Sequence, residues 1–191
     1  GGIDALEFLL NHDATLLDIK TSNHMTSLMC AAQAGETAAC IYLLQQGANS
    51  NACLPSGINA LLLTISLGFE ETAIAMINHA TTLAINTCND SGLNALHMAL
   101  DLGFFNLAKH LVGKAINIYQ RRKTDGLMPL ELIVKQGAVD ALNLVVAQGM
   151  TLKIDSFNGL TLLHYAIESQ SFAILKIIAK QCSHLLAKAD P

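Results

Sequence analysis

Charged side chains are scarce in this sequence. Asp, Glu, Lys and Arg make up 14% of the 191 residues, whereas a soluble domain usually has about 25%. Hydrophobic residues account for 52%, so the chain cannot be a disordered segment, which needs high charge and low hydrophobicity. A chain of 191 residues suits one compact domain or one short repeat array. The scarcity of charge therefore predicts a folded chain with an extensive core.

The sequence also lacks a long uninterrupted apolar run. Residues 37–69 contain no charged side chain, but Gln45, Gly47, Pro55 and Gly57 interrupt them. A membrane-spanning helix needs about 20 predominantly apolar residues in a row. The first ten residues have no basic segment ahead of their apolar positions, as a secretory signal would. We therefore expect neither a membrane span nor a signal peptide.

Basic residues are too few to bind a phosphate backbone. Eleven Lys and Arg oppose fifteen Asp and Glu, for a net charge of -4, which excludes an extended positive surface and makes nucleic acid an unlikely partner class. The basic cluster Arg121, Arg122 and Lys123 is typical of a solvated loop tip. The five cysteines are an odd number without a C-x-x-C pair, so we expect free thiols, a reducing compartment and a cytoplasmic location.

The common catalytic and cofactor motifs are missing. The sequence has no G-x-G-x-x-G, no G-x-x-x-x-G-K-[ST], no G-x-S-x-G and no H-E-x-x-H, which are the usual phosphate, nucleophile and zinc signatures. We therefore expect no enzyme activity, and we assign no catalytic residue, cofactor or metal ligand.

An internal repeat organises the chain. Five leucines recur at spacings of 33, 35, 34 and 33 residues, namely Leu28, Leu61, Leu96, Leu130 and Leu163. Seven residues after them lie Gly35, Gly68, Gly103, Gly137 and, at the fifth place, Gln170. Four residues before the last four leucines lie Gly57, Gly92, Gly126 and Gly159. A constant period of this length predicts a solenoid of stacked units.

The segments around these leucines resemble the ankyrin repeat, whose motif is approximately G-x-T-P-L-H-x-A-A-x-x-G followed by an amphipathic helix ending in L-L-x-x-G-A. The best copies are residues 92–99 and 159–166, and the best ending is residues 43–49. The resemblance implies an all-α ankyrin-repeat solenoid of stacked helix-turn-helix units with short loops or β-turns between repeats. It implies one array over residues 1–191, with a partial repeat at 1–20 and repeats at 21–53, 54–88, 89–122, 123–155 and 156–191.

Local signals agree with two helices per unit. In the third unit, Asn94 is a suitable N-cap for a short helix from Ala95 to about Leu102, and Gly103 supplies a left-handed stop. A second helix is predicted from about Asn106 to Val112, and in all second helices the apolar residues recur at i, i+3 and i+4. On the same pattern, Cys40 is predicted to be an inert core residue. The resemblance implies that His97 and His164 hydrogen-bond neighbouring loop backbone.

Both ends of the array are expected to be incomplete. Residues 5–10 are typical of the second helix of a unit whose first helix is absent, and residues 174–187 of an unusually apolar last helix. Terminal repeats of a complete solenoid present a polar outer face. We therefore expect an ordered fragment of a longer protein.

The resemblance also implies a binding surface on the concave face, formed by the residue after each motif glycine and the exposed side of each first helix. The first set, the ladder, is Met25, Ile58, Leu93, Leu127 and Leu160. The polar border is Gln33, Ser66, Asp101, Lys135 and Glu168, and further apolar candidates are Phe157, Leu67 and Leu102. An exposed apolar row would suit a partner's apolar side chains. The ladder can equally pack against neighbouring loops as part of the stack.

The function expected from this resemblance is binding of a protein partner by a monomer. The degenerate motif and the plentiful Asn, Ile and Leu resemble ankyrin-bearing effectors that intracellular bacterial pathogens deliver into host cells, which would place the protein in the host-cell cytosol. An alternative is the targeting or regulatory ankyrin domain of a larger enzyme or channel. A third is a purely structural spacer, which requires a buried ladder.

Overall fold

The computed structural model describes residues 2–80, 83–114, 116–150, 152 and 160–189. Its helices are α1 (Gly2–His12), the 3-10 helix η1 (Ala14–Asp18), α2 (Ser27–Ala34), α3 (Thr37–Gln45), α4 (Ala60–Ser66), α5 (Glu70–His79), α6 (Ala95–Asp101), α7 (Phe105–Gly113), α8 (Pro129–Lys135), α9 (Val139–Ala147), α10 (Leu162–Glu168) and α11 (Phe172–Ala189). The extended pairing found in these described ranges is one isolated antiparallel bridge between Cys53 and Asn59. The predicted all-α fold is confirmed.

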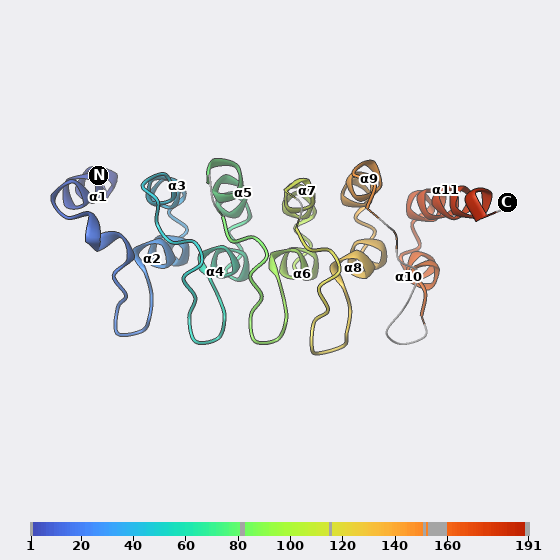
Figure 1. The fold of residues 1–191 in the computed structure, drawn as a ribbon, viewed down its shortest axis with the longest axis horizontal. Coiled ribbons are helices and arrows are strands. Elements are labelled where there is room, and N and C mark those ends of the chain that lie inside the picture. The colour runs from blue at the N-terminus through green and yellow to red at the C-terminus, as the bar shows by residue number, and fades with distance from the viewer. Residues whose placement is uncertain (1, 81–82, 115, 151, 153–159, 190–191) are drawn as a thin grey trace.

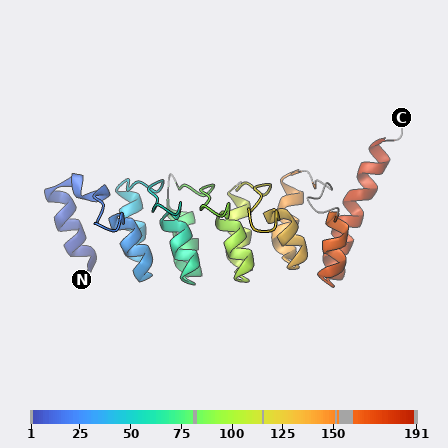
Figure 2. The same cartoon turned by 90° about the horizontal axis from the view of Figure 1, so that it is seen from below.

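The helices form two layers (Figure 1). The first helices α2, α4, α6, α8 and α10 lie in one layer, and α3, α5, α7, α9 and α11 lie beside α1 in the other. Each first helix packs against the second helix of its own unit and against the first helices next to it in the described part of the chain. The loops between units extend from the first layer, on the side away from the second. Figure 2 shows the units side by side in one row, with these loops at one end of the helices.

Side-chain caps begin the first helices. Thr26 and Asn59 each accept a hydrogen bond from the backbone N–H three residues later, at 3.3 and 2.9 Å. Asn94 does the same for His97 at 3.1 Å, as predicted. The fourth unit uses Pro129 at the first helical position, where no N–H is needed. Four of the five first helices therefore start at polar residues that the sequence places about one unit apart, and the fourth unit is the exception.

Residues with positive φ end the first helices. Gly103 has φ 76, a conformation that glycine adopts without a steric penalty. The non-glycine residues with positive φ in the described ranges are His24 (φ 62) and Gln170 (φ 51). Both stand where the repeat pattern otherwise has glycine. The turn geometry of the unit therefore persists even where the sequence departs from the pattern.

Neighbouring units also cap each other. The second helices α3, α5, α7 and α9 start without a local side-chain cap. The Glu70 carboxylate on α5 accepts a 3.1 Å hydrogen bond from the backbone N–H of Leu107 in the first turn of α7. The Thr37 and Thr72 hydroxyls, from α3 and α5, lie 2.6 Å apart. These contacts tie the turns of adjacent units together.

The core lies between the two layers and between successive units. One cluster runs from Leu61 in α4 to Ile178 in α11, and a second joins Leu28 in α2 to Met76 in α5. Cys40 is fully buried in the second cluster, as predicted. Within the described part of the chain, no helix is both long and apolar enough to cross a bilayer.

Candidate functional site

The loops between units are tight turns closed by the ladder residues. The backbone carbonyls of Met25, Ile58 and Leu93 accept hydrogen bonds from the N–H four residues earlier, at 2.8, 2.9 and 3.0 Å. In the fourth unit the turn is one residue longer, because Arg122 N donates to the Leu127 carbonyl at 3.1 Å. In each of these four loops, the backbone carbonyl of the ladder residue therefore closes the turn.

The ladder side chains are shielded to different degrees. Leu127 is 8% exposed and belongs to the main core cluster. Ile58 and Leu160 are half-buried against the same cluster, and Met25 is half-buried against the second. Leu93 is also half-buried. The ladder thus presents partial surface at four units and no open surface at Leu127.

His97 connects the first helix of its unit to the next loop. Its Nδ1 accepts a 3.2 Å hydrogen bond from Asn94 N–H, and its Nε2 donates to the Leu127 carbonyl at 3.2 Å. The ring is fully buried, and this burial lowers the pKa of His97 below its ordinary 6.5. A neutral ring with the proton on Nε2 satisfies both partners. The expected role of His97, holding neighbouring loop backbone, is confirmed.

His164 makes the hydrogen bond within its own unit that His97 makes in the third unit. Its Nδ1 accepts a 3.0 Å hydrogen bond from Thr161 N–H, but the side chain is exposed. In the described residues no loop of a following unit lies against α10, so the contact to a neighbouring loop that the resemblance implies does not appear.

The polar border carries an ion-pair cluster at the third and fourth units. The Arg122 guanidinium donates to the carboxylates of Asp101 and Asp125, with N–O distances of 2.6 Å to each. Hydrogen bonding from Arg122 holds the pKa of Asp125 below its usual value. The Arg122 side chain is 14% exposed, so the expectation of a solvated loop tip is wrong for this residue. The cluster fastens the loop to α6.

The polar border also includes Lys135 of the fourth unit and Glu168 of the fifth. Lys135 on α8 lies 3.7 Å from the Glu168 carboxylate on α10, and its Nζ lies 5.9 Å from the centre of the Tyr165 ring. Gln33 and Ser66 are exposed at the equivalent places. The polar border is therefore accessible at all five units. Phe157 lies outside the described residues.

Exposed apolar side chains gather where the first helices turn into the second. Leu67 and Leu102, both predicted, are 46% and 48% exposed, and Phe69 and Phe105 are 36% and 44% exposed. They lie in the α4–α5 and α6–α7 turns of adjacent units, with Phe105 as the first residue of α7. We call these four residues the turn patch. Exposed apolar side chains are typical of an interaction surface where they form a patch.

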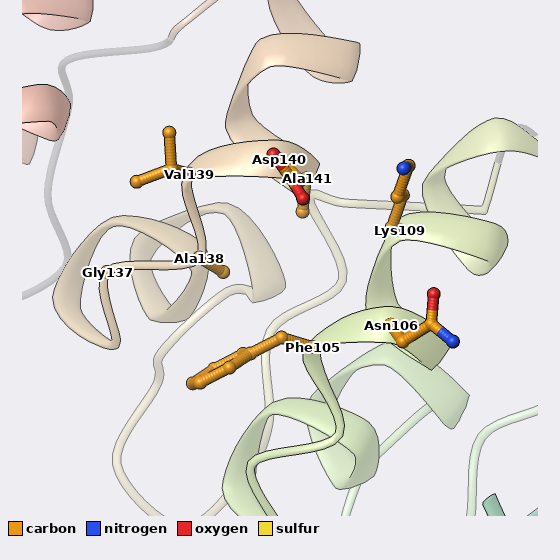
Figure 3. Close-up of a pocket in the computed structure, with 8 residues that line it drawn as sticks. All are labelled: Phe105, Asn106, Lys109, Gly137, Ala138, Val139, Asp140 and Ala141. Atoms are coloured by element: carbon orange, nitrogen blue, oxygen red, sulfur yellow. The ribbon is translucent and has the colours of Figure 1, made fainter.

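A cavity of about 310 Å³ adjoins the turn patch (Figure 3). Its lining is Phe105, Asn106 and Lys109 from α7 with Gly137, Ala138, Val139, Asp140 and Ala141 from the turn and start of α9. Figure 3 shows Phe105, Asn106 and Lys109 on α7 on one side, and Val139, Asp140 and Ala141 at the start of α9 on the other. The cavity can therefore accept an apolar side chain beside a polar group.

The sequence reasoning missed Phe69 and Phe105. Both stand eight or nine residues after a repeat leucine, where the remaining residues of the five units are Glu36, Thr37, Glu70, Phe104, Ala138, Val139, Ser171 and Phe172. The recurrence of phenylalanine at these turn positions was the available signal.

Two features of the described residues bear on metal binding and on nucleophilic chemistry. No group of three or more metal-ligating side chains occurs in those ranges. Burial raises the pKa of the Cys40 thiol to about 11, which makes it a poor nucleophile.

Comparison with protein families identifies the unit. Residues 23–53 match the model of the ankyrin repeat. No curated protein shows significant similarity to the chain. The matched segment contains α2, α3 and the loops on either side, and the four helix pairs that follow repeat its arrangement (Figure 1).

Proposed function

Because residues 23–53 match the ankyrin repeat and four further helix pairs follow in the same order, we propose that this chain is an ankyrin-repeat solenoid that binds a protein partner through surface residues of several consecutive units and acts without catalysis. The proposed units are residues 21–53, 54–88, 89–122, 123–155 and 156–191, after a partial unit at 1–20. The contact surface comprises the concave face, with its polar border, the loop tips and the turn patch.

The observation that carries this proposal is the turn patch with its adjoining cavity. Leu102 and Phe105 keep almost half of their surface exposed, although the chain buries most of its other large apolar side chains. Successive helix layers are separated by roughly 10 Å, so a partner with apolar side chains at that spacing can contact two or more units at once. The exposed polar border, with Asp101 and Lys135, then surrounds an apolar centre, as in other protein interfaces.

The double variant Leu102→Asp and Phe105→Asp tests the proposal. Two carboxylates in the patch must be desolvated when a partner binds, which is costly, while both positions are exposed and tolerate charge in the free protein. Ile167→Asp is the control, because Ile167 is 61% exposed but lies on α10, outside the patch.

Each protein is used for affinity capture from lysate, captured proteins are identified by mass spectrometry, and binding is then titrated with the purified partner. The double variant is expected to lose the partner that the wild type and Ile167→Asp retain, with thermal unfolding by circular dichroism unchanged. Equal binding by all three folded proteins contradicts the turn patch as the contact surface.

A finer proposal concerns where the module acts. The resemblance to effectors of intracellular bacteria supports a role as part of a secreted effector in the host-cell cytosol. The free thiols Cys30, Cys40, Cys53 and Cys88 are compatible with such a reducing compartment. A translocation reporter fused to the full-length protein tests this; export independent of a bacterial secretion system contradicts it.

A further inference from the structure

The cations on the two layers of the array differ in what they contact. On the first-helix side, Arg122 and Lys135 each pair with a carboxylate of the same or a neighbouring unit. On the second-helix side, Lys109 in α7 and Lys114 directly after it are exposed, and neither forms an ion pair with any described residue. Helix α7 itself contains no acidic residue. This part of a chain with net charge -4 is therefore cationic.

Two cavities lie beside these lysines. The first, of about 310 Å³, adjoins the turn patch and includes Lys109 in its lining. The second, of about 240 Å³, is lined by Lys109, His110, Gly113 and Lys114, with Asn78 of α5 and Leu144 of α9. Because Lys109 lines both, the two cavities are neighbours along the contact of α7 with α9. We call the strip of α7 from Phe105 to Lys114, with the α9 residues that line the two cavities, the α7–α9 seam.

The two ends of the seam differ in chemistry. Phe105, Lys109 and Gly113 recur every four residues and so lie on one side of α7, over a length of about 12 Å. Phe105 is 44% exposed at the first cavity. Among the described lining residues the carboxylate is Asp140, in the first cavity, where Figure 3 shows it on the α9 side across from Lys109. The seam therefore runs from an apolar end at Phe105 to a cationic end at Lys114.

Gly113 keeps the second cavity open. It is the last residue of α7 and does not have the positive φ that requires glycine at the turns. A Cβ built on Gly113 meets nothing within 4 Å. Neither the backbone nor the packing of the chain therefore needs glycine here, although glycine weakens a helix relative to alanine. The equivalent residues of the neighbouring units are Gln45, Asn78 and Ala147, and a side chain of that size would reach into the cavity.

We propose that the α7–α9 seam binds an acidic segment of the protein partner, with carboxylates at Lys109 and Lys114 and a large apolar side chain at Phe105. This inference rests on the proposed function and describes the partner by its chemistry. Charge complementarity selects the occupant, because carboxylates neutralise two lysines that the described chain leaves without an ion pair. Lys109 lies about 6 Å and Gly113 about 12 Å along α7 from Phe105. An extended segment rises about 3.3 Å per residue, so its acidic residues stand two to four places from the apolar one.

A nucleic acid fits the seam less well than a protein segment. A phosphate backbone needs an extended row of cations, whereas the seam offers two lysines next to an apolar cavity. The net charge of -4 also repels a polyanion. A peptide can carry the carboxylate and the apolar side chain together, as both ends of the seam require.

Selection from a phage-displayed library of random peptides identifies the preferred ligand, with the full 191-residue chain immobilised. Peptides of about twelve residues are long enough to span the seam. The enriched peptides are expected to place an acidic residue two to four positions from a large apolar one. One enriched peptide is then synthesised with a fluorescent label, and its Kd is measured by fluorescence anisotropy. A library that yields no enriched peptide, or enriched peptides without acidic residues, overturns the proposal.

Charge reversal locates the bound peptide. The double variant Lys109→Glu and Lys114→Glu is expected to raise the Kd at least about tenfold, because two attractions become repulsions. The control is Lys176→Glu with Lys180→Glu, which makes the same change of charge on exposed residues of α11 and should leave the Kd within about twofold. Raising the salt concentration should weaken binding to the wild type more than binding to the Lys109 and Lys114 variant, because salt screens the attraction. Equal Kd values for the two double variants contradict the proposal.

Filling the second cavity tests the seam without changing its charge. Gly113→Leu is expected to raise the Kd at least about tenfold and to leave thermal unfolding unchanged or at higher temperature, because leucine favours a helix more than glycine does. Ala147→Leu is the matched control, since Ala147 is exposed at the equivalent place of α9 and lines neither cavity. Equal peptide binding by these two folded variants excludes the second cavity as part of the site.

Two results would identify another occupant and overturn the proposal. A labelled single-stranded oligonucleotide that binds more tightly than the peptide, and depends on Lys109 and Lys114, would show a nucleic-acid site. Self-association in sedimentation that the charge reversal abolishes would show a second copy of the chain. In lysate capture, loss of the partner by Leu102→Asp with Phe105→Asp but not by the lysine variant refutes this inference alone. Retained capture by both variants refutes the turn patch as well.

Discussion

Substituting alanine for Gly92 or Gly103 separates two reasons for glycine in this array. Both residues have φ 76, so an alanine pays the same left-handed penalty of about 1 kcal/mol at either position. A Cβ on Gly103 meets nothing within 4 Å. A Cβ on Gly92 lies 3.0 Å from the Arg121 carbonyl oxygen and 3.4 Å from the Arg122 Cα. Only Gly92→Ala therefore pushes two loops apart.

The magnitudes follow from these contacts. Gly103→Ala is expected to lower the free energy of unfolding by about 1 kcal/mol. Gly92→Ala adds the cost of shifting backbone, typically about 1–3 kcal/mol, for a total of about 2–4 kcal/mol. The contact is with backbone atoms, so a change of side-chain rotamer cannot relieve it.

Urea unfolding followed by circular dichroism measures both variants, and hydrogen exchange locates the change. Amides of residues 121–127 are expected to exchange faster in Gly92→Ala than in Gly103→Ala, because their loop receives the new methyl group. Equal losses of stability in the two variants would refute the reasoning, since the loop contact would then contribute nothing. Normal exchange at residues 121–127 would refute it as well.

Three further outcomes are expected. Burial lowers the pKa of His97 below 6.5 in the folded protein, so the unfolded chain binds this proton more tightly. The free energy of unfolding should therefore fall as the pH drops from about 7.5 to 5. The variant His97→Gln should show a weaker dependence on pH when both proteins are unfolded in urea. Gln170→Gly should raise the free energy of unfolding by about 0.5–1 kcal/mol by removing left-handed strain, and an unchanged or lower urea midpoint contradicts this. Leu127→Asp should lower the free energy of unfolding by more than about 3 kcal/mol, because it buries an unpaired charge. Leu102→Asp should change the free energy of unfolding by no more than about 0.5 kcal/mol. Similar melting of the two variants would show that Leu127 is not part of the core.

The repeat could be predicted from the sequence because its signals are local. The leucine and glycine spacings, the Asn94 cap and the i, i+3, i+4 pattern depend on residues within one helix or turn. The structure confirms the helices of the third unit to within one residue at each end, with α6 at Ala95–Asp101 and α7 at Phe105–Gly113. A solenoid also places each unit only against its neighbours, so local pattern and overall architecture coincide.

The sequence by itself therefore determined the class of fold and the register of the units, both of which depend on period and residue type, while the family resemblance implied that His97 hydrogen-bonds neighbouring loop backbone. Accessibility was decided by the tertiary structure. Leu127 and Leu93 hold the same place in the repeat, yet Leu127 is part of the core while Leu93 is half-buried. The turn that contains Leu127 is one residue longer than the turn that contains Leu93. Arg122 is mostly shielded from solvent where it pairs with Asp101 of its own unit and with Asp125 of the next. The exposure of a side chain depends on which residues fold against it, some of them from a neighbouring unit, and the repeat pattern does not contain that information.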